Sequence, residues 1–225
     1  MRPVMCMITA AVRCASEEAV LLDRISAAAR AGVHLIQVRQ PEMEAGALAR
    51  LVRRVVEVAR GTEARILVND RADVALVAGA HGVQLRGISV AGTRVRAVAP
   101  PGFLIGRSVH AAEEGARAAV DEGLDYLLFG TVFETKSKPG AETAGPSGLA
   151  AACHAVTLPV LAVGGMTCPR LRSVAAAGAA GFAAIGLFAD VSIDQIPDVV
   201  QQASAAFDTD TGLPNIPIAS HLQAS

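Results

Sequence analysis

Short apolar runs alternate along this chain with longer segments in which small and polar residues recur at helical spacing. Four places share one local plan, in which a helix rich in small residues ends near a glycine and a short apolar run follows; they are Ala28–Arg39, Val77–Leu85, Ala118–Gly130 and Val174–Gly186. A glycine at such a join accepts positive φ without steric cost and therefore ends a helix well. The repeated join predicts alternating strands and helices, hence a parallel sheet covered by helices.

The apolar runs predict eight strands, over Val4–Thr9, Val33–Arg39, Arg65–Asn69, Gly82–Leu85, Phe103–Val109, Asp125–Gly130, Pro159–Val163 and Gly181–Ile185. The intervening segments predict eight helices, over Glu17–Ala31, Glu44–Ala59, Arg71–Ala78, Ser89–Val98, Ala111–Glu122, Ser147–Ala155, Cys168–Ala177 and Ile193–Phe207. Eight regular units favour an α/β fold of the (β/α)₈ TIM-barrel type, as one domain over residues 1–207. The alternative is an open doubly wound sheet, but the glycine runs lack the G-x-G-x-x-G spacing of dinucleotide sites.

The last residues, 208–225, differ in composition from the rest of the chain. They contain Thr, Pro, Ser and Asn without hydrophobic periodicity. We interpret them as a disordered C-terminal tail with no assigned role.

Composition narrows the range of partners. The 225 residues carry a formal net charge of −1, so there is no basic footprint for nucleic acid or for an anionic membrane. The longest uncharged run, Ser173–Ala189, is interrupted by glycines and fits a helix end plus a strand better than a membrane span. We expect a small-molecule partner, with no nucleic-acid or membrane partner, and the sequence leaves open whether the chain forms a homo-oligomer.

The four cysteines point to a reducing compartment. They are Cys6, Cys14, Cys153 and Cys168, and they lie far apart without a C-x-x-C pair or histidines at metal-ligand spacing. Neither a zinc site nor a disulfide framework is indicated. Reduced thiols and a cytoplasmic location are expected.

In a barrel of this type, functional groups lie at the carboxyl ends of the strands and in the loops that follow. The loop after the sixth strand carries Thr135 and Lys138 between flexible glycines, a composition that fits a phosphate-contacting lid or, alternatively, a solvated loop. Gly164, Gly165 and Gly186 follow the last two strands, where barrels often bind phosphate through backbone N–H groups. The alternative is that these glycines only form turns.

His110 is the histidine that lies just beyond the carboxyl end of a strand. Alternation along the fifth strand places Ser108 and His110 on the same face. A histidine at the mouth can move protons near neutral pH, although a structural role is equally compatible with the position.

Two further pairs lie at strand ends. Gln37 and Arg39 share a face of the second strand, and Arg39 either clamps an anionic ligand or pairs with an acid such as Glu42. Asn69 ends the third strand and Asp70 follows it, where Asp70 either binds a metal or caps the next helix.

Three segments closely resemble the thiamine-phosphate synthase/TenI superfamily. They are the Gly-Arg-Ser-Val-His stretch that ends at His110, the stretch Asp125–Thr135 and the stretch Pro159–Thr167, and the similarity extends from about Met5 to Phe207. The resemblance implies a (β/α)₈ barrel, in agreement with the count of units. It is closest to TenI-type thiazole tautomerases, in which a histidine at the position of His110 transfers the proton.

Departures from the synthase pattern separate two activities of this superfamily. The synthase pattern has a lysine after Gln-x-Arg and a second magnesium-binding aspartate after the fourth strand. Here Pro41 stands at the lysine position, and the segment Gln84–Ser89 has no aspartate. Stabilising a departing pyrophosphate requires cations, so these losses disfavour the synthase.

The resemblance therefore implies a thiazole tautomerase that aromatises a carboxythiazole phosphate without a cofactor. His110 is the expected catalytic residue, and the expected substrate- and phosphate-binding residues are Gln37, Arg39, Asn69, Ser108, Thr135, Lys138, Gly164, Gly165 and Gly186. One alternative is a magnesium-dependent thiamine-phosphate synthase, with Asp70 as a metal ligand. Another is a regulatory protein that binds a thiazole phosphate without turnover, and a different phosphosugar-type barrel isomerase is disfavoured because no acid–base pair beyond His110 is evident.

Overall fold

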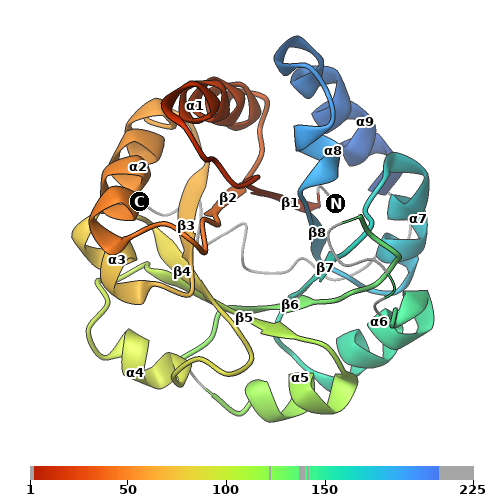
Figure 1. The fold of residues 1–225 in the computed structure, drawn as a ribbon. Coiled ribbons are helices and arrows are strands. Elements are labelled where there is room, and N and C mark those ends of the chain that lie inside the picture. Colours follow the sequence, from red (N-terminus) through yellow and green to blue (C-terminus); the bar gives the residue numbers. More distant parts are fainter. Residues whose placement is uncertain (1–2, 122, 137–139, 141, 208–225) are drawn as a thin grey trace.

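The computed structural model describes residues 3–121, 123–136, 140 and 142–207, and within them eight parallel strands close into a barrel in sequence order (Figure 1). The strands are β1 (Val4–Ile8), β2 (Leu35–Val38), β3 (Arg65–Asn69), β4 (Gly82–Leu85), β5 (Leu104–Val109), β6 (Tyr126–Phe129), β7 (Val160–Val163) and β8 (Gly181–Ala184). Each lies within two residues of its predicted bounds. β1 pairs with β8 and closes the barrel, which confirms the predicted (β/α)₈ fold.

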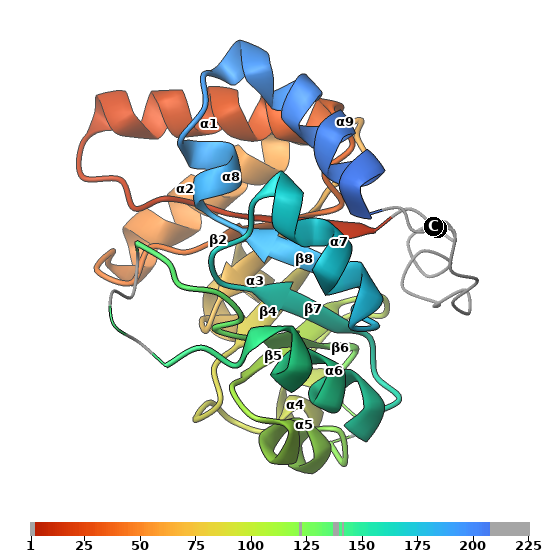
Figure 2. The same cartoon turned by 90° about the vertical axis from the view of Figure 1, so that its right-hand side faces the viewer.

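Helices surround the strands in one layer (Figures 1 and 2). They are α1 (Ala15–Arg30), α2 (Ala45–Val58), α3 (Ala72–Val77), α4 (Gly92–Arg96), α5 (Ala112–Ala118), α6 (Gly145–Ala155), α7 (Cys168–Ala176), α8 (Gly186–Ala189) and α9 (Ile196–Phe207), with a 3₁₀ turn, η1 (Ile193–Gln195), before α9. The short helix α8 is absent from the prediction, because four residues carry no measurable periodicity. The predicted tail, 208–225, lies outside the described residues.

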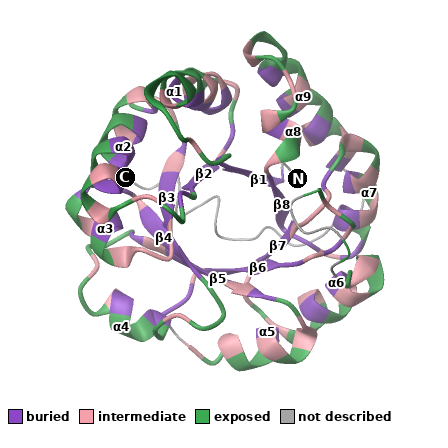
Figure 3. Cartoon of the chain, in the orientation of Figure 1, coloured by how far each residue is buried: buried purple, intermediate pink, exposed green. Residues whose placement is uncertain are grey.

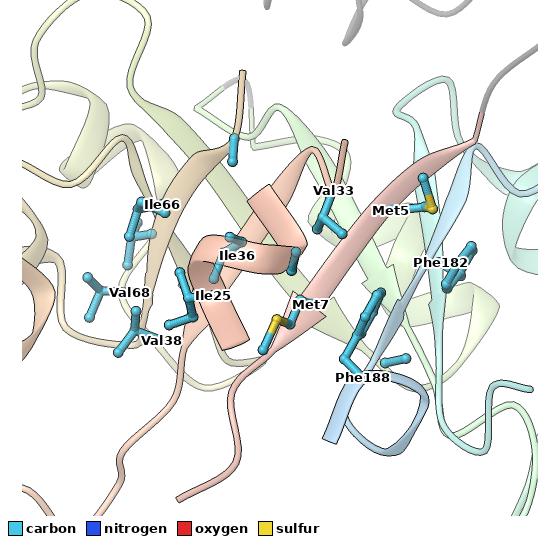
Figure 4. Packing of buried hydrophobic residues seen from close by; sticks show 14 of the residues in the cluster. Met5, Met7, Ile25, Val33, Ile36, Val38, Ile66, Val68, Phe182 and Phe188 are labelled. Atoms are coloured by element: carbon cyan, nitrogen blue, oxygen red, sulfur yellow. The ribbon is translucent and has the colours of Figure 1, made fainter. Parts of the chain in front are cut away.

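Alternation along the strands separates two apolar cores. On β2, Ile36 and Val38 point outward to the helices, whereas Leu35 points into the barrel. The outer core packs strands against helices such as α1, which has buried positions along its length (Figure 3). Ile25 of this helix is fully buried among these side chains (Figure 4). The inner core fills the barrel interior with residues such as Leu67 and Leu161. The open space of the barrel lies above this core, at the carboxyl ends of the strands.

The four cysteines are free thiols in the structure. Within the described part of the chain, no helix has the length and apolar character that a membrane span requires.

Candidate active site

A cavity of about 510 Å³ opens at the carboxyl ends of the strands. Its floor includes the apolar side chains of Ile8, Leu128 and Val163, which rise from β1, β6 and β7. Its wall carries these predicted residues: Gln37, Arg39, Asn69, Asp70, Ser108, His110, Thr135 and Gly164. The barrel therefore brings together side chains from strands β2, β3 and β5 that are far apart in the sequence.

His110 lies one residue beyond β5, and its ring is bound on one side only. Nδ1 contacts the carbonyl oxygen of Gly130, and the backbone N–H of His110 donates to Glu114 Oε2 at 2.7 Å. A carbonyl oxygen can only accept, so Nδ1 carries the proton and the neutral ring keeps a lone pair on Nε2. Nε2 has no hydrogen-bond partner among the described residues, which leaves it available to accept a proton from a ligand in the cavity.

Ser108 belongs to a hydrogen-bond chain that descends into the barrel. Tyr126 donates its hydroxyl proton to Gln84 Oε1 at 2.6 Å, and Gln84 Nε2 donates to Ser108 Oγ at 3.1 Å. Because Ser108 Oγ already accepts, its own proton is available to the cavity. Complete burial raises the pKa of Tyr126 well above its ordinary value, so the phenol stays protonated as the donor of the chain.

Gly106 makes room for that chain. A Cβ at this position would lie 2.2 Å from Tyr126 Cζ and 2.5 Å from Gln84 Oε1. Glycine is therefore the residue that lets the phenol and the amide meet inside the barrel.

Gln37 and Asn69 form a second amide pair. Gln37 Nε2 donates to Asn69 Oδ1 at 2.9 Å, while Gln37 Oε1 is buried and has no hydrogen-bond partner among the described residues. A buried acceptor without a donor costs about 1–3 kcal/mol. Because Gln37 lines the cavity, a ligand with an N–H or O–H group could satisfy it.

Arg39 extends from the end of β2 into the cavity wall. Its backbone N–H donates to Thr9 Oγ1 at 2.9 Å, and its guanidinium forms no ion pair with Glu42 or with another described acid. The alternative of a structural pair with Glu42 is therefore not found, and the group is open to an anionic ligand.

Asp70 is held by the neighbouring β4–α4 loop. Arg86 Nε lies 2.6 Å from Asp70 Oδ2, and Ser89 Oγ donates to Asp70 Oδ1. The side chain does not cap the next helix, since α3 has no side-chain cap. Asp70 itself adopts φ of 60°, a left-handed conformation that short polar side chains tolerate.

A magnesium ion does not fit this donor set. Asp70 is the one carboxylate on the described wall of the cavity, and Arg86 and Ser89 occupy both of its oxygens. A cation within coordination distance would also face the guanidinium of Arg86. Among the described residues, no group of three or more histidine, cysteine or acidic side chains is placed to hold a metal.

The predicted phosphate-binding glycines lie around an adjoining cavity of about 570 Å³. Gly164 and Gly165 have φ of 105° and 62°, and Gly186 begins α8. A Cβ on Gly165 would lie 2.3 Å from the carbonyl oxygen of Glu134, so only glycine fits there. Thr135 and Gly164 line both cavities, which makes them neighbouring parts of one mouth; predicted Lys138 lies outside the described residues.

Three arginines at this mouth are not among the residues predicted from the sequence. Arg86 and Arg71 line the first cavity, and Arg170 lines the second, where its Nη1 donates to the carbonyl oxygen of Gly165 at 2.7 Å. Arg86 follows β4 directly, so the rule that strand ends carry function would have found it. Arg170 lies in the helix α7, where that rule gives no signal.

These features define a (β/α)₈-barrel protein with a polar, cationic mouth suited to a small anionic ligand. A family model described as thiamine monophosphate synthase matches residues 5–188, and the chain belongs to this family. The chain is 42% identical over 162 residues to the thiamine-phosphate synthase of Anaeromyxobacter dehalogenans, covering 71% of each chain. It is 34% identical over 184 residues to that of Chlorobium luteolum, covering 81% of this chain and 84% of the relative.

A solved structure described as thiamine phosphate pyrophosphorylase from Pyrococcus furiosus has the same fold. It superposes with a TM-score of 0.77 at 26% sequence identity and covers 91% of this chain and 96% of the other. Relatives and structure alike connect the chain with thiamine biosynthesis. Their names correspond to the synthase and not to the tautomerase expected from the sequence.

Proposed function

We propose that the protein is a thiazole tautomerase of thiamine biosynthesis. The observation that carries the proposal is His110, whose Nδ1 proton is held by the Gly130 carbonyl while Nε2 stays open to the cavity. Nε2 takes the proton from the ring carbon that bears the carboxylate and returns a proton to the exocyclic alkylidene carbon. The electron pair of the broken C–H bond enters the ring, which becomes aromatic, so no atom is gained or lost.

The surrounding residues have supporting roles in this proposal. The backbone N–H groups near Gly165 and Gly186 hold the phosphate, with Thr135 beside them. Ser108 donates into the cavity, and Arg39 pairs with the substrate carboxylate. A positioned proton-transfer group typically contributes about 10²–10⁴-fold, which suits a reaction whose aromatic product is favoured.

Thiamine-phosphate synthase is the second candidate, and the names of the relatives favour it. The unpartnered acceptor Gln37 Oε1 also favours it, because an aminopyrimidine brings an N–H donor and the thiazole tautomer has none on its ring. Against it stand Pro41 at the lysine position and the engagement of both Asp70 oxygens.

Two incubations of the purified protein separate the candidates. In the first it receives the carboxythiazole phosphate tautomer in the presence of EDTA; in the second it receives aminopyrimidine pyrophosphate, thiazole phosphate and Mg²⁺. Chromatography measures the product of each mixture. We expect aromatic carboxythiazole phosphate in the first mixture and no thiamine phosphate in the second. Thiamine phosphate alone would establish the synthase instead, and ligand binding without either product would indicate a regulatory protein.

A further inference from the structure

The turn after β4 is built to hold one guanidinium at the cavity wall. Ser89 Oγ accepts from the backbone N–H of Arg86 at 3.0 Å, and the backbone N–H of Ser89 donates to the carbonyl of Arg86 at 3.1 Å. Arg107, which is only 7% exposed, donates from Nη1 to the carbonyl oxygens of Arg86 and Gly87 at 3.1 and 3.2 Å. The turn is therefore anchored from inside the protein.

Arg86 is also fixed at its side chain, through one nitrogen. Its Nε binds Asp70 Oδ2 at 2.6 Å, while neither Nη group has a partner among the described residues. A guanidinium oriented in this way presents its remaining N–H groups as a planar fork, the geometry that binds a carboxylate in bidentate fashion. Asp70 thus orients a cation that belongs to the chain itself.

The charged side chains of this wall have a net positive charge, which favours an anionic ligand. Arg71 is committed to Asp73 through two contacts of 2.9 and 2.6 Å. Arg39 has no ion-pair partner among the described residues, and Arg86 shares its charge with Asp70. Of the three arginines on the described lining of this cavity, two are thus paired with aspartates, and Arg39 leaves the wall with a net positive charge.

The wall lies across the mouth from the glycines. In a closed barrel of eight strands, β3 and β4 are opposite β7 and β8, as Figure 1 shows. Arg86 follows β4, whereas Gly164 and Gly165 follow β7 and Gly186 follows β8. His110, after β5, lies on the circumference between these two positions.

We propose that Arg86, oriented by Asp70 and accompanied by Arg39, forms a second anion subsite that binds a carboxylate without a metal ion. The protein then selects a ligand with a phosphate at one end and a carboxylate at the other, over the same phosphate without its carboxylate. The proposal rests on the proposed function, because it assumes that a thiazole phosphate occupies the mouth.

Calorimetric titration with two stable ligands tests the subsite. The ligands are aromatic carboxythiazole phosphate and the same thiazole phosphate without the carboxylate, each titrated in EDTA and again with excess Mg²⁺. We expect the carboxylated ligand to bind at least about tenfold more tightly, which is about 1.4 kcal/mol, with the same preference in both buffers. Arg86→Gln removes the preference and leaves the affinity for the ligand without carboxylate unchanged.

Arg94→Gln is the matched control, because Arg94 is an exposed arginine on α4 outside both cavities. The Arg94→Gln variant should keep the full preference for the carboxylated ligand. For Arg86→Gln, unchanged binding of the ligand without carboxylate shows that the variant is folded. Equal affinity of the wild type for both ligands, or a preference that appears only with Mg²⁺, overturns the subsite but not the proposed function. Binding of neither ligand overturns both.

Discussion

The imidazole of His110 is bound through one nitrogen and open at the other. The carbonyl of Gly130 selects the tautomer, and the backbone N–H of His110 is held by Glu114. Gly130, which also lines the cavity, thus orients the ring, and Glu114 holds the backbone of the same residue. A ring oriented in this way is ready to accept a proton before a ligand arrives.

His110→Asn tests this role at the scale of one side chain. Asparagine keeps a polar group of similar reach but lacks a nitrogen that can accept a proton, so we expect tautomer turnover to fall by about 10²–10⁴-fold. Binding of thiazole phosphate, measured by calorimetry, should be unchanged. His154→Asn, on α6 and exposed, is the control that keeps full turnover; near-normal turnover of His110→Asn would refute the assignment.

The buried thiol of Cys6 on β1 should lower the stability of the folded protein at alkaline pH. Burial inside the barrel raises the pKa of its thiol from 9.0 to about 12. The folded state therefore holds this proton to a higher pH than the unfolded state. The free energy of unfolding consequently falls as the pH rises from 9.0 to about 12. The slope contributed by one such group is at most about 1.4 kcal/mol per pH unit.

Urea unfolding at a series of pH values compares the wild type with Cys6→Ala. We expect the alanine variant to show a shallower alkaline decline, because it has no thiol to ionise. Cys14→Ala is the control at an exposed position: a hydrogen bond with Ser16 lowers the pKa of this thiol, so its removal should not make the alkaline decline shallower. Parallel curves for wild type and Cys6→Ala would contradict the buried thiol's contribution.

At the scale of elements, close contact between neighbouring strands depends on particular glycines. Gly181 on β8 is in register with Val4 on β1, the pair that closes the barrel. A Cβ on Gly181 would lie 2.0 Å from the carbonyl oxygen of Val4, which is backbone and cannot rotate away. Glycine at this position therefore permits the closing pair of strands.

Gly181→Ala should destabilise the protein by at least about 1–3 kcal/mol, the usual cost of overpacking, measured by chemical denaturation. Gly46→Ala on α2 is the matched control, because its Cβ would meet only Arg50 Nη1 at an ordinary 3.7 Å. Alanine favours a helix, so this control should be neutral or up to about 1 kcal/mol more stable. Equal stability of both variants would show that β1 and β8 can separate without cost.

At the scale of the whole molecule, the last described helix completes the outer layer. α9 buries Ile196, Val200, Ala203 and Phe207, and the ring of Phe207 lies 6.1 Å from that of Phe182 on β8. Residues up to Phe207 therefore belong to the core.

Two truncations test where the folded unit ends. A chain that stops after Phe207 should unfold at the same temperature as the full chain and keep its activity, because the core contacts remain. A chain that stops before Ile196 should lose stability by several kcal/mol, since it exposes the apolar side of α7 and β8. A large drop in melting temperature for the first truncation would contradict this boundary.

The amino-acid sequence by itself determined the eight strands, their order and the residues that share the inner face. Each of these follows from local rules: alternation in strands, glycine at helix ends, and the strand-end position of Gln37, Arg39, Ser108 and His110. Only the tertiary structure decided which groups meet: Tyr126 with Gln84, Asp70 with Arg86, and His110 with Gly130. These pairs depend on barrel closure and side-chain rotamers, which bring residues from different strand ends to hydrogen-bond distance, and no local pattern encodes that geometry.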